Sequence, residues 1–208
     1  MIAIVDYGAG NLRSIQKALE RQGLEARITD APRALDEAEA LVVPGDGAFG
    51  PAMERLRSAG FADRIRAFVD SGRPFLGICL GMQLLFDASE EDGVHRGLGV
   101  LPGRVVRLSG GVKVPHMGWN ALRLLRPSPL LDGCATGEYV YFIHSYHPVP
   151  ADPGLVAATT EYGGPVAAVV GRRNVWATQF HPEKSGAVGI RMVANFARWA
   201  VGAGASGR

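Results

Sequence analysis

The first half of the chain alternates short, fully apolar runs with longer amphipathic stretches. The runs at 2–5, 40–43 and 75–78 are apolar throughout and end at turn residues or a cysteine, which is typical of strands buried on both faces. Between them, apolar residues recur at helical spacing, and we expect a further strand at 25–29 and helices from 12 to just before Gly23, over about 51–58 and over 65–71. Strands that alternate with helices predict a parallel α/β sheet.

The second half has a different pattern. From Gly97 onward, short β-type runs follow one another with turn residues between them, at 105–108, 139–144, 156–160, 166–170 and 175–179. This predicts an antiparallel or mixed extension of the sheet, followed by a final amphipathic helix over about 187–201. We expect residues 1–208 to form one domain.

Composition excludes several classes of function. The chain is 47% hydrophobic and 20% charged with a formal net charge of +2, and it has no basic tract, so we expect no nucleic-acid partner. No apolar run approaches the roughly 20 residues of a membrane span. The two cysteines, Cys79 and Cys134, belong to no metal-ligand motif, and the N-terminus does not resemble a signal peptide. We expect a cytoplasmic protein without a metal or cofactor.

Cys79 is the candidate nucleophile. It lies at the centre of Gly77-Ile-Cys79-Leu-Gly81, directly after an apolar run, and G-x-C-x-G is the thiol counterpart of the nucleophile elbow. Glycines suit the crowded backbone of such a turn. A helix expected from about Leu80 to Ala88 would direct its positive end at the sulfur and favour the thiolate. The alternative is a buried structural cysteine.

A candidate base follows a later strand, in Gln179-Phe-His181-Pro-Glu183. A nucleophilic thiol needs a base, and that base needs an orienting acceptor. On an extended segment, residues two apart point the same way, so Glu183 would hold one ring nitrogen of His181 while the other faces Cys79. Both segments follow strand ends, where ligands bind in open α/β sheets. Taken alone, His181 is also compatible with an ordinary turn histidine.

Two glycine-rich segments and several polar residues have weaker signals. Pro44-Gly-Asp46-Gly47 could direct backbone N–H groups at an oxyanion, with the Leu80 N–H as second donor, or be a plain loop. Gly8-Ala-Gly10 only partly matches a dinucleotide fingerprint, so we interpret it as a tight turn. The acidic residues 90–92 are expected at a solvated helix end, where one could contact a cationic group. The remaining histidines are interpreted as ordinary polar or surface residues: His95, His116, His144 and His147.

Together these motifs resemble the class I (triad-type) glutamine amidotransferases over nearly the whole chain. The nucleophile motif extends from Gly77 to Gln83, and the His-Glu pair is His181-Pro-Glu183. Three further segments, 6–14, 115–120 and 142–146, resemble the glutaminase subunits of imidazole glycerol phosphate synthases. The Met117-Gly-Trp-Asn120 sequence discriminates best among the families of this class.

The resemblance implies a flavodoxin-like α/β fold and hydrolysis of L-glutamine through a Cys79 thioester, with His181 and Glu183 completing a triad. It implies oxyanion donors at Gly47 and Leu80 and no cofactor. The ammonia would pass to a separate (β/α)₈-barrel cyclase subunit, forming a heterodimer. The implied glutamine contacts are Gly45, Gln83, Glu91, His144, Ser145 and Tyr146, and the implied partner contacts are Met117, Trp119 and Asn120.

One position departs from the family pattern. Family members often have Pro-Gly-Val-Gly in the oxyanion segment, and here Asp46 replaces the valine. Two other functions stay open, namely the glutaminase subunit of a different synthase and a catalytically silent module on the same fold. If neutral His181 is the base, activity should fall at low pH as the ring is protonated.

Overall fold

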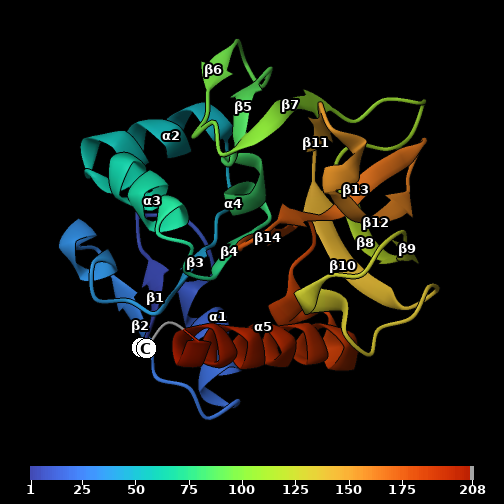
Figure 1. Cartoon of the computed structure of the whole chain (residues 1–208). Helices are drawn as coiled ribbons and strands as arrows, with labels where there is room; N and C mark the ends of the chain where they lie inside the picture. Colours follow the sequence, from blue (N-terminus) through green and yellow to red (C-terminus); the bar gives the residue numbers. More distant parts are fainter. Residues whose placement is uncertain (207–208) are drawn as a thin grey trace.

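The computed structural model of the protein describes residues 1–206, and the side chains of residues 1–202. Its centre is an eight-stranded sheet (Figure 1). In spatial order the strands are β2 (Ala26–Thr29), β1 (Ile2–Val5), β3 (Ala40–Val43), β4 (Phe75–Ile78), β14 (Val175–Thr178), β13 (Pro165–Arg172), β12 (Val156–Glu161) and β9 (Arg123–Leu124).

The sheet changes character at β14. From β2 to β14 every neighbouring pair is parallel, whereas β14, β13, β12 and β9 pair antiparallel. The order β2-β1-β3-β4 is that of flavodoxin-like sheets. The predicted parallel α/β sheet and its antiparallel extension are therefore confirmed.

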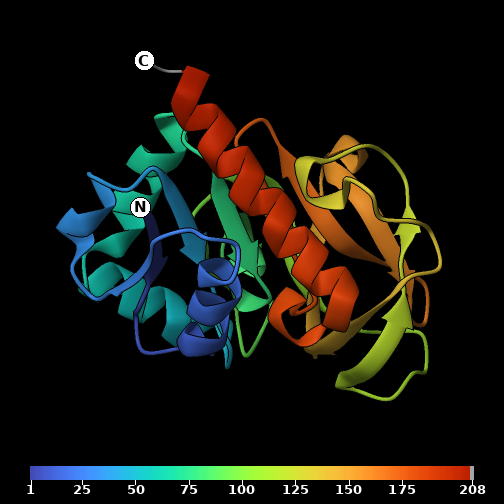
Figure 2. The same ribbon diagram turned by 90° about the horizontal axis from the view of Figure 1, so that it is seen from below.

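Helices cover both faces of the parallel strands. Helices α1 (Leu12–Glu20) and α5 (Gly186–Ser206) lie on one face, and α2 (Phe49–Ser58) and α3 (Phe61–Asp70) lie on the other (Figures 1 and 2). Alternate residues of each strand enter the two resulting cores: Ile4 packs in the same cluster as Ile15 of α1, and Val5 in the same cluster as Phe49 of α2. This two-sided burial explains why the strand sequences are uniformly apolar.

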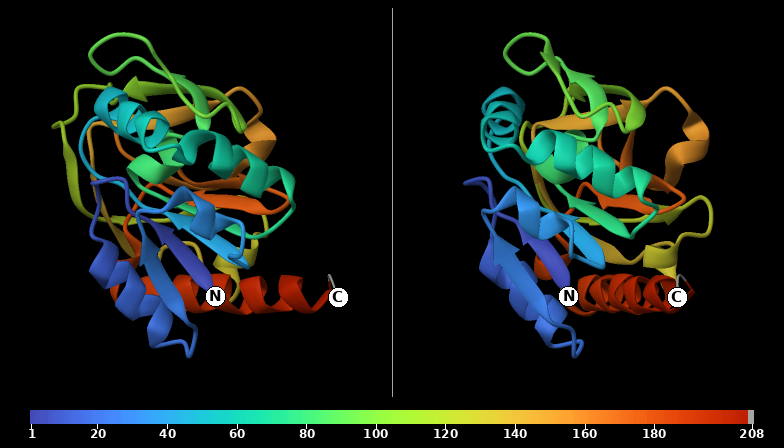
Figure 3. Two further views of the ribbon diagram at one scale, coloured as in Figure 1. Left: turned by 90° about the vertical axis from the view of Figure 1, so that its left-hand side faces the viewer. Right: turned by 60° about the vertical axis from the view of Figure 1, so that its left-hand side comes forward.

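Two smaller sheets complete the fold (Figure 3). Strand β8 (His116–Ala121) pairs antiparallel with β10 (Tyr139–His144). The other sheet has the order β11 (Tyr146–Pro150), β7 (Leu101–Arg107), β5 (Phe86–Ser89) and β6 (His95–Arg96). The β runs predicted from Gly97 onward are thus divided among three sheets, and strands β5, β6, β8, β9 and β11 are additional to the prediction.

The helix after Cys79 is much shorter than predicted. Helix α4 spans only Leu80–Gln83, and the chain then enters strand β5 instead of continuing to Ala88. Leu84 and Leu85 are fully buried, and the Leu85 carbonyl accepts backbone bonds from Val100 (2.8 Å) and Leu101 (3.0 Å). Tertiary pairing therefore overrides local helix propensity. Residues 90–92 consequently form a turn between β5 and β6, not a helix end.

Smaller differences concern element ends. Helices α2 and α3 begin earlier than predicted, at Phe49 and Phe61, and α5 continues to Ser206. Within the described part of the chain, four short 3₁₀ helices lie in the connections: η1 (Pro32–Leu35), η2 (Pro129–Leu131), η3 (Pro153–Leu155) and η4 (Pro182–Lys184). Among residues 1–206, no helix combines the length and apolar character needed to cross a membrane.

Candidate active site

Cys79 occupies a strained turn between β4 and α4. Its backbone has φ 55° and ψ −110°, a conformation that L-residues rarely adopt. A Cβ at Gly81 would overlap the carbonyl of Val43, and a Cβ at Gly77 would lie 2.9 Å from the Gly81 carbonyl oxygen. The structure thus has the predicted elbow, and both flanking positions require glycine.

The base and its acceptor meet the elbow because β14 pairs with β4. Thr178 is the register partner of Ile78, so both chains leave the sheet at the same edge. His181 Nδ1 lies 2.8 Å from Glu183 Oε1, and the Cys79 thiol is near enough to the His181 ring to raise its pKa. His181 and Glu183 are joined by the 3₁₀ turn η4, whereas the sequence predicts an extended segment.

This arrangement changes the charge of His181. Burial alone would lower its pKa, but hydrogen bonds with Cys79 and Glu183 and the charges of both raise that pKa from 6.5 to about 10. The imidazolium form is therefore favoured at neutral pH. A charged imidazolium beside a cysteine sulfur is an arrangement found at reactive cysteine nucleophiles.

Two other groups contact the sulfur. The Cys79 thiol lies 3.8 Å from the Ile143 carbonyl oxygen, and the Gln179 amide nitrogen lies 3.8 Å from Sγ. Gln179 is fully buried, and its own Oε1 accepts from Gln83 Nε2 at 3.1 Å. Sequence reasoning did not single out Gln179, although it immediately precedes the Phe-His-Pro-Glu segment.

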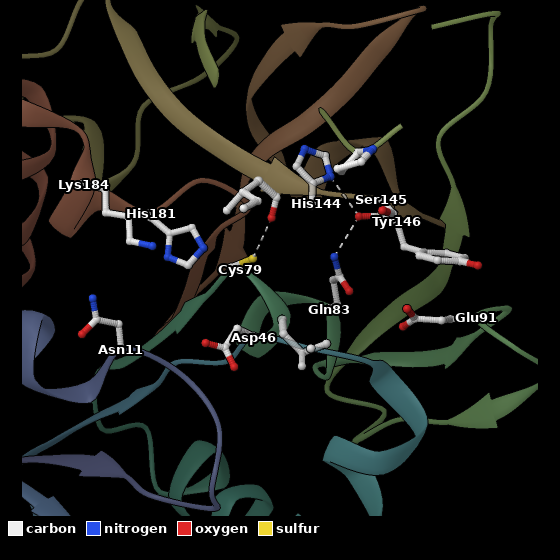
Figure 4. A pocket seen from close by; sticks show the side chains of 14 residues that line it. Asn11, Asp46, Cys79, Gln83, Glu91, His144, Ser145, Tyr146, His181 and Lys184 are labelled. Atoms are coloured by element: carbon white, nitrogen blue, oxygen red, sulfur yellow. Dashed lines mark hydrogen bonds between the residues drawn. The ribbon is translucent and has the colours of Figure 1, made fainter. Parts of the chain in front are cut away.

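A cavity of about 320 Å³ opens beside the sulfur (Figure 4). Most of the sequence-predicted site residues line it: Gly47, Cys79, Leu80, Gln83, Glu91, His144, Ser145, Tyr146 and His181. Asp46 lines it as well. The lining also includes four residues that the sequence does not predict: Asn11, Pro115, Ile143 and Lys184. Gly45 is buried outside the lining, where a Cβ would lie 3.0 Å from that of Leu80.

The loop after β3 forms one wall of the cavity. Gly47 has φ +84°, which requires glycine, and the Tyr7 hydroxyl donates to the Pro44 carbonyl at 2.9 Å. Burial, with the charges of Asp46 and Cys79, raises the pKa of Tyr7, so this donor stays protonated. The Gly10 N–H donates to Asp46 Oδ1 at 3.0 Å. Asp46, the residue that differs from the family pattern, therefore connects this loop to the turn after β1.

Glu91 faces the cavity from the turn after β5 (Figure 4). Its Oε2 accepts from the backbone N–H of Phe49 at 2.7 Å, the first residue of α2. A carboxylate at this position stabilises the helix N-terminus. The same side chain thus links α2 to the cavity.

The interpretation of His116 and His144 as ordinary polar or surface residues is wrong. They are 3% and 6% exposed, and His116 Nδ1 lies 3.0 Å from His144 Nε2. The pairing arises because the two residues are register partners of β8 and β10, and β8 was not visible in the sequence pattern.

The three residues expected at a partner interface lie on β8. Met117 and Trp119 are 60% and 55% exposed, whereas Asn120 is half-buried and donates to the Glu161 carbonyl at 2.9 Å. Within residues 1–206, no three His, Cys, Asp or Glu side chains gather as metal ligands would.

Comparisons with known proteins agree with this geometry. The family model described as "Glutamine amidotransferase class-I" matches residues 3–199. "Imidazole glycerol phosphate synthase subunit HisH" of Syntrophotalea carbinolica is 55% identical over 203 residues, covering 94% of this chain and 98% of that protein. The protein of the same name from Geobacillus kaustophilus is 53% identical over 210 residues, covering 98% and 99%.

Solved structures show the same fold. A crystal structure of a glutamine amidotransferase superposes with a TM-score of 0.76 at 25% identity, covering 97% of this chain and 100% of that one. PurLQS from Thermotoga maritima gives a TM-score of 0.75 at 22% identity, covering 95% and 97%.

Proposed function

The chain belongs to the class-I glutamine amidotransferases, and from this premise we propose that it is the glutaminase subunit of an imidazole glycerol phosphate synthase. Relatives named as subunits of that synthase align over almost the full length of the chain at about half identity. The 2.8 Å bond between His181 and Glu183, beside the thiol on the elbow, is the observation that carries the proposed chemistry. Residues 1–208 act as one catalytic domain.

In the first step the Cys79 thiolate attacks the side-chain carboxamide carbon of L-glutamine. A C–S bond forms, and the carbonyl oxygen becomes an oxyanion that the Leu80 and Gly47 N–H groups stabilise. Leu80 is the first residue of α4, so its N–H has no acceptor within that helix. The position of Gly47 on the cavity wall supports its role as second donor.

His181 then gives its proton to the nitrogen as the C–N bond breaks, and ammonia leaves. The raised pKa of His181 supports this role as acid, since the imidazolium is present before the attack. Once neutral, the ring takes a proton from water, which attacks the thioester. Glutamate is released and the thiolate returns. Glu183 holds the ring by its Nδ1–H in both steps.

The cavity wall opposite His181 supports binding of the amino-acid end of glutamine. Glu91 has the charge for the α-ammonium group. Gln83, Ser145 and Tyr146 have polar groups suited to the α-carboxylate, with His144 behind them and Gly45 shaping the loop. These assignments follow the family pattern, and the presence of all but Gly45 in the cavity lining supports them.

We further propose that the ammonia passes to a (β/α)₈-barrel cyclase subunit in a heterodimer. There it would enter the formation of imidazole glycerol phosphate and an aminoimidazole carboxamide ribotide. The exposed Met117 and Trp119 support a protein contact on β8, since exposed large apolar side chains mark interfaces. The need for a reduced thiol supports a cytoplasmic location.

The test is a glutaminase assay with and without the cyclase subunit and its ligand. We expect Cys79→Ala to abolish glutamine hydrolysis while binding to the cyclase survives, and Cys134→Ala to retain the wild-type rate. Wild-type turnover by Cys79→Ala would disprove the triad. Co-purification with a different synthase would disprove the assignment to imidazole glycerol phosphate synthase but not the chemistry.

A further inference from the structure

The ring of His144 has both nitrogen atoms engaged inside the protein. Nδ1 lies 3.0 Å from the Tyr146 carbonyl oxygen, and Nε2 lies 3.0 Å from His116 Nδ1 (Figure 4 shows the first of these). A carbonyl oxygen can only accept, so His144 Nδ1 must have the hydrogen. In a neutral ring, Nε2 is then an acceptor, and His116 Nδ1 must be the donor.

The tautomer of His116 is fixed in turn. With its hydrogen on Nδ1, its Nε2 is an acceptor, and the Asn120 amide nitrogen lies 3.4 Å from it. That amide also donates to the Glu161 carbonyl. Hydrogen bonds therefore run in one direction from Asn120 through His116 and His144 to Tyr146.

Burial keeps both rings neutral, as this direction requires. It lowers the pKa of His116 to about 4 and that of His144 to about 3. His116 is clamped between two aromatic rings, stacked on Phe142 and Tyr162 at centroid distances of 4.6 and 3.8 Å. The ring is thus held in one orientation.

The same hydrogen-bond network continues to the nucleophile. The Tyr146 carbonyl that accepts from His144 also accepts from Gln83 Nε2 at 2.8 Å (Figure 4). Gln83 Nε2 also donates to Gln179 Oε1 at 3.1 Å, and Gln179 Nε2 lies 3.8 Å from Cys79 Sγ. The orientation of the Tyr146 carbonyl therefore helps to position the Gln83 and Gln179 side chains beside the sulfur.

We propose that His116 is a positioning residue for the glutaminase reaction, which donates its Nδ1–H to His144 and thereby fixes the tautomer of His144 and the Tyr146 carbonyl. His144 then acts on the site through Tyr146 and Gln83, since neither of its ring nitrogens is free to hold glutamine. This inference rests on the proposed function.

The direct test is the tautomer itself, read from the ring ¹⁵N shifts of the wild-type protein labelled with ¹⁵N-histidine. We expect both His116 and His144 to be neutral with the hydrogen on Nδ1. A hydrogen on Nε2 of either ring, or a charged ring at neutral pH, would overturn the proposal. This measurement needs no activity, so it gives an answer even if the glutaminase assignment fails.

Two variants separate donation from packing. His116→Phe keeps a ring between Phe142 and Tyr162 but removes the donor, whereas His116→Asn places an amide N–H near the position of Nδ1. We expect His116→Phe to lower kcat/KM for glutamine about tenfold, because a buried acceptor loses its donor, and to shift the His144 resonances. His116→Asn should recover most of both, and His95→Phe should change neither.

Equal impairment in His116→Phe and His116→Asn, or wild-type kcat/KM in His116→Phe, would overturn the positioning role. If wild-type protein with its cyclase hydrolyses no glutamine at all, the proposed function fails, and the ¹⁵N spectrum still decides the tautomers. If His116→Phe does not fold, the wild-type spectrum and the His116→Asn kinetics decide.

Discussion

His181 Nδ1 lies 2.8 Å from Glu183 Oε1, across the single 3₁₀ turn η4. The Glu183 side chain is almost completely buried, with 1% of it exposed, so its charge acts on His181 with little screening by water. Together with Cys79 it raises the pKa of His181 to about 10. The sequence alone predicts a neutral imidazole base, whereas the structure favours an imidazolium beside the thiol.

The raised pKa of His181 determines the pH dependence of the reaction. Because departing ammonia takes its proton from the imidazolium, we expect activity to persist through neutral pH and to fall as the pH rises toward about 10. Glu183→Gln should move this alkaline fall down by about one pH unit or more. The measurement is kcat/KM for glutamine against pH, with the cyclase subunit present. An alkaline fall at the same pH in both proteins would contradict the coupling.

The same bond contributes to stability with a defined sign. The folded-state pKa of His181 lies above 6.5, so its contribution is full below pH 6.5 and is lost as the pH rises through about 10. The free energy of unfolding, measured by denaturant titration, should therefore decrease with rising pH across this range. The decrease should be larger for wild type than for Glu183→Gln.

Gly81 should tolerate no side chain. Its Cβ would overlap the Val43 carbonyl, which belongs to the backbone of β3 and cannot rotate away. We expect Gly81→Ala to destabilise the fold by about 2–3 kcal/mol. Gly202→Ala is the matched control, because a Cβ there meets open space on α5, and it should stabilise by up to about 1 kcal/mol. Thermal unfolding compares them, and equal midpoints would refute the close approach.

Asp46 should hold the loop after β3 against the turn after β1. Asp46→Val removes the acceptor of the Gly10 N–H, so we expect about 1 kcal/mol lower stability and several-fold faster hydrogen exchange at Gly10. Asp46→Asn retains an acceptor oxygen and should behave like wild type. Unchanged exchange at Gly10 in Asp46→Val would show that the bond does not hold the loop.

Trp119 should contribute to cyclase binding. It is 55% exposed on β8 beside Met117, so truncation leaves the core intact. We expect Trp119→Ala to raise the Kd for the cyclase about 30-fold, as for a central interface tryptophan, with an unchanged Tm. Val94→Ala removes an even more exposed apolar side chain on the β5–β6 turn and should leave the Kd unchanged. Equal Kd values for the two variants would place the interface elsewhere.

The parts of the structure that sequence predicts are those fixed locally. The runs 40–43 and 75–78 become strands with the predicted bounds because burial on both faces leaves an unbroken apolar signal. The elbow at Cys79 is predicted because Gly77 and Gly81 are each required by a backbone contact. His181 and Glu183 are predicted because their spacing and their place after a strand are visible in the chain.

The parts that sequence misses depend on distant segments. Strand β5 pairs with β7, where Phe86 is the register partner of Leu101, and no local pattern reveals this competitor to a longer α4. His116 and His144 meet through the register of β8 and β10, and Gly118 and Asn120, which are uncommon in strands, weaken the local β signal of β8. The sequence places Gln179 only at the end of a strand, and its contact with Cys79 depends on the three-dimensional structure.

The most direct test of the central claim is covalent labelling with a chloroketone analogue of glutamine, read by peptide mass spectrometry in the presence of the cyclase and its ligand. We expect one adduct, on Cys79, that excess glutamine prevents. Cys134 is half-buried, and burial raises its pKa, so it should stay unlabelled. An adduct on Cys134 alone, or an unmodified Cys79 under these conditions, would contradict the assignment of Cys79 as the nucleophile.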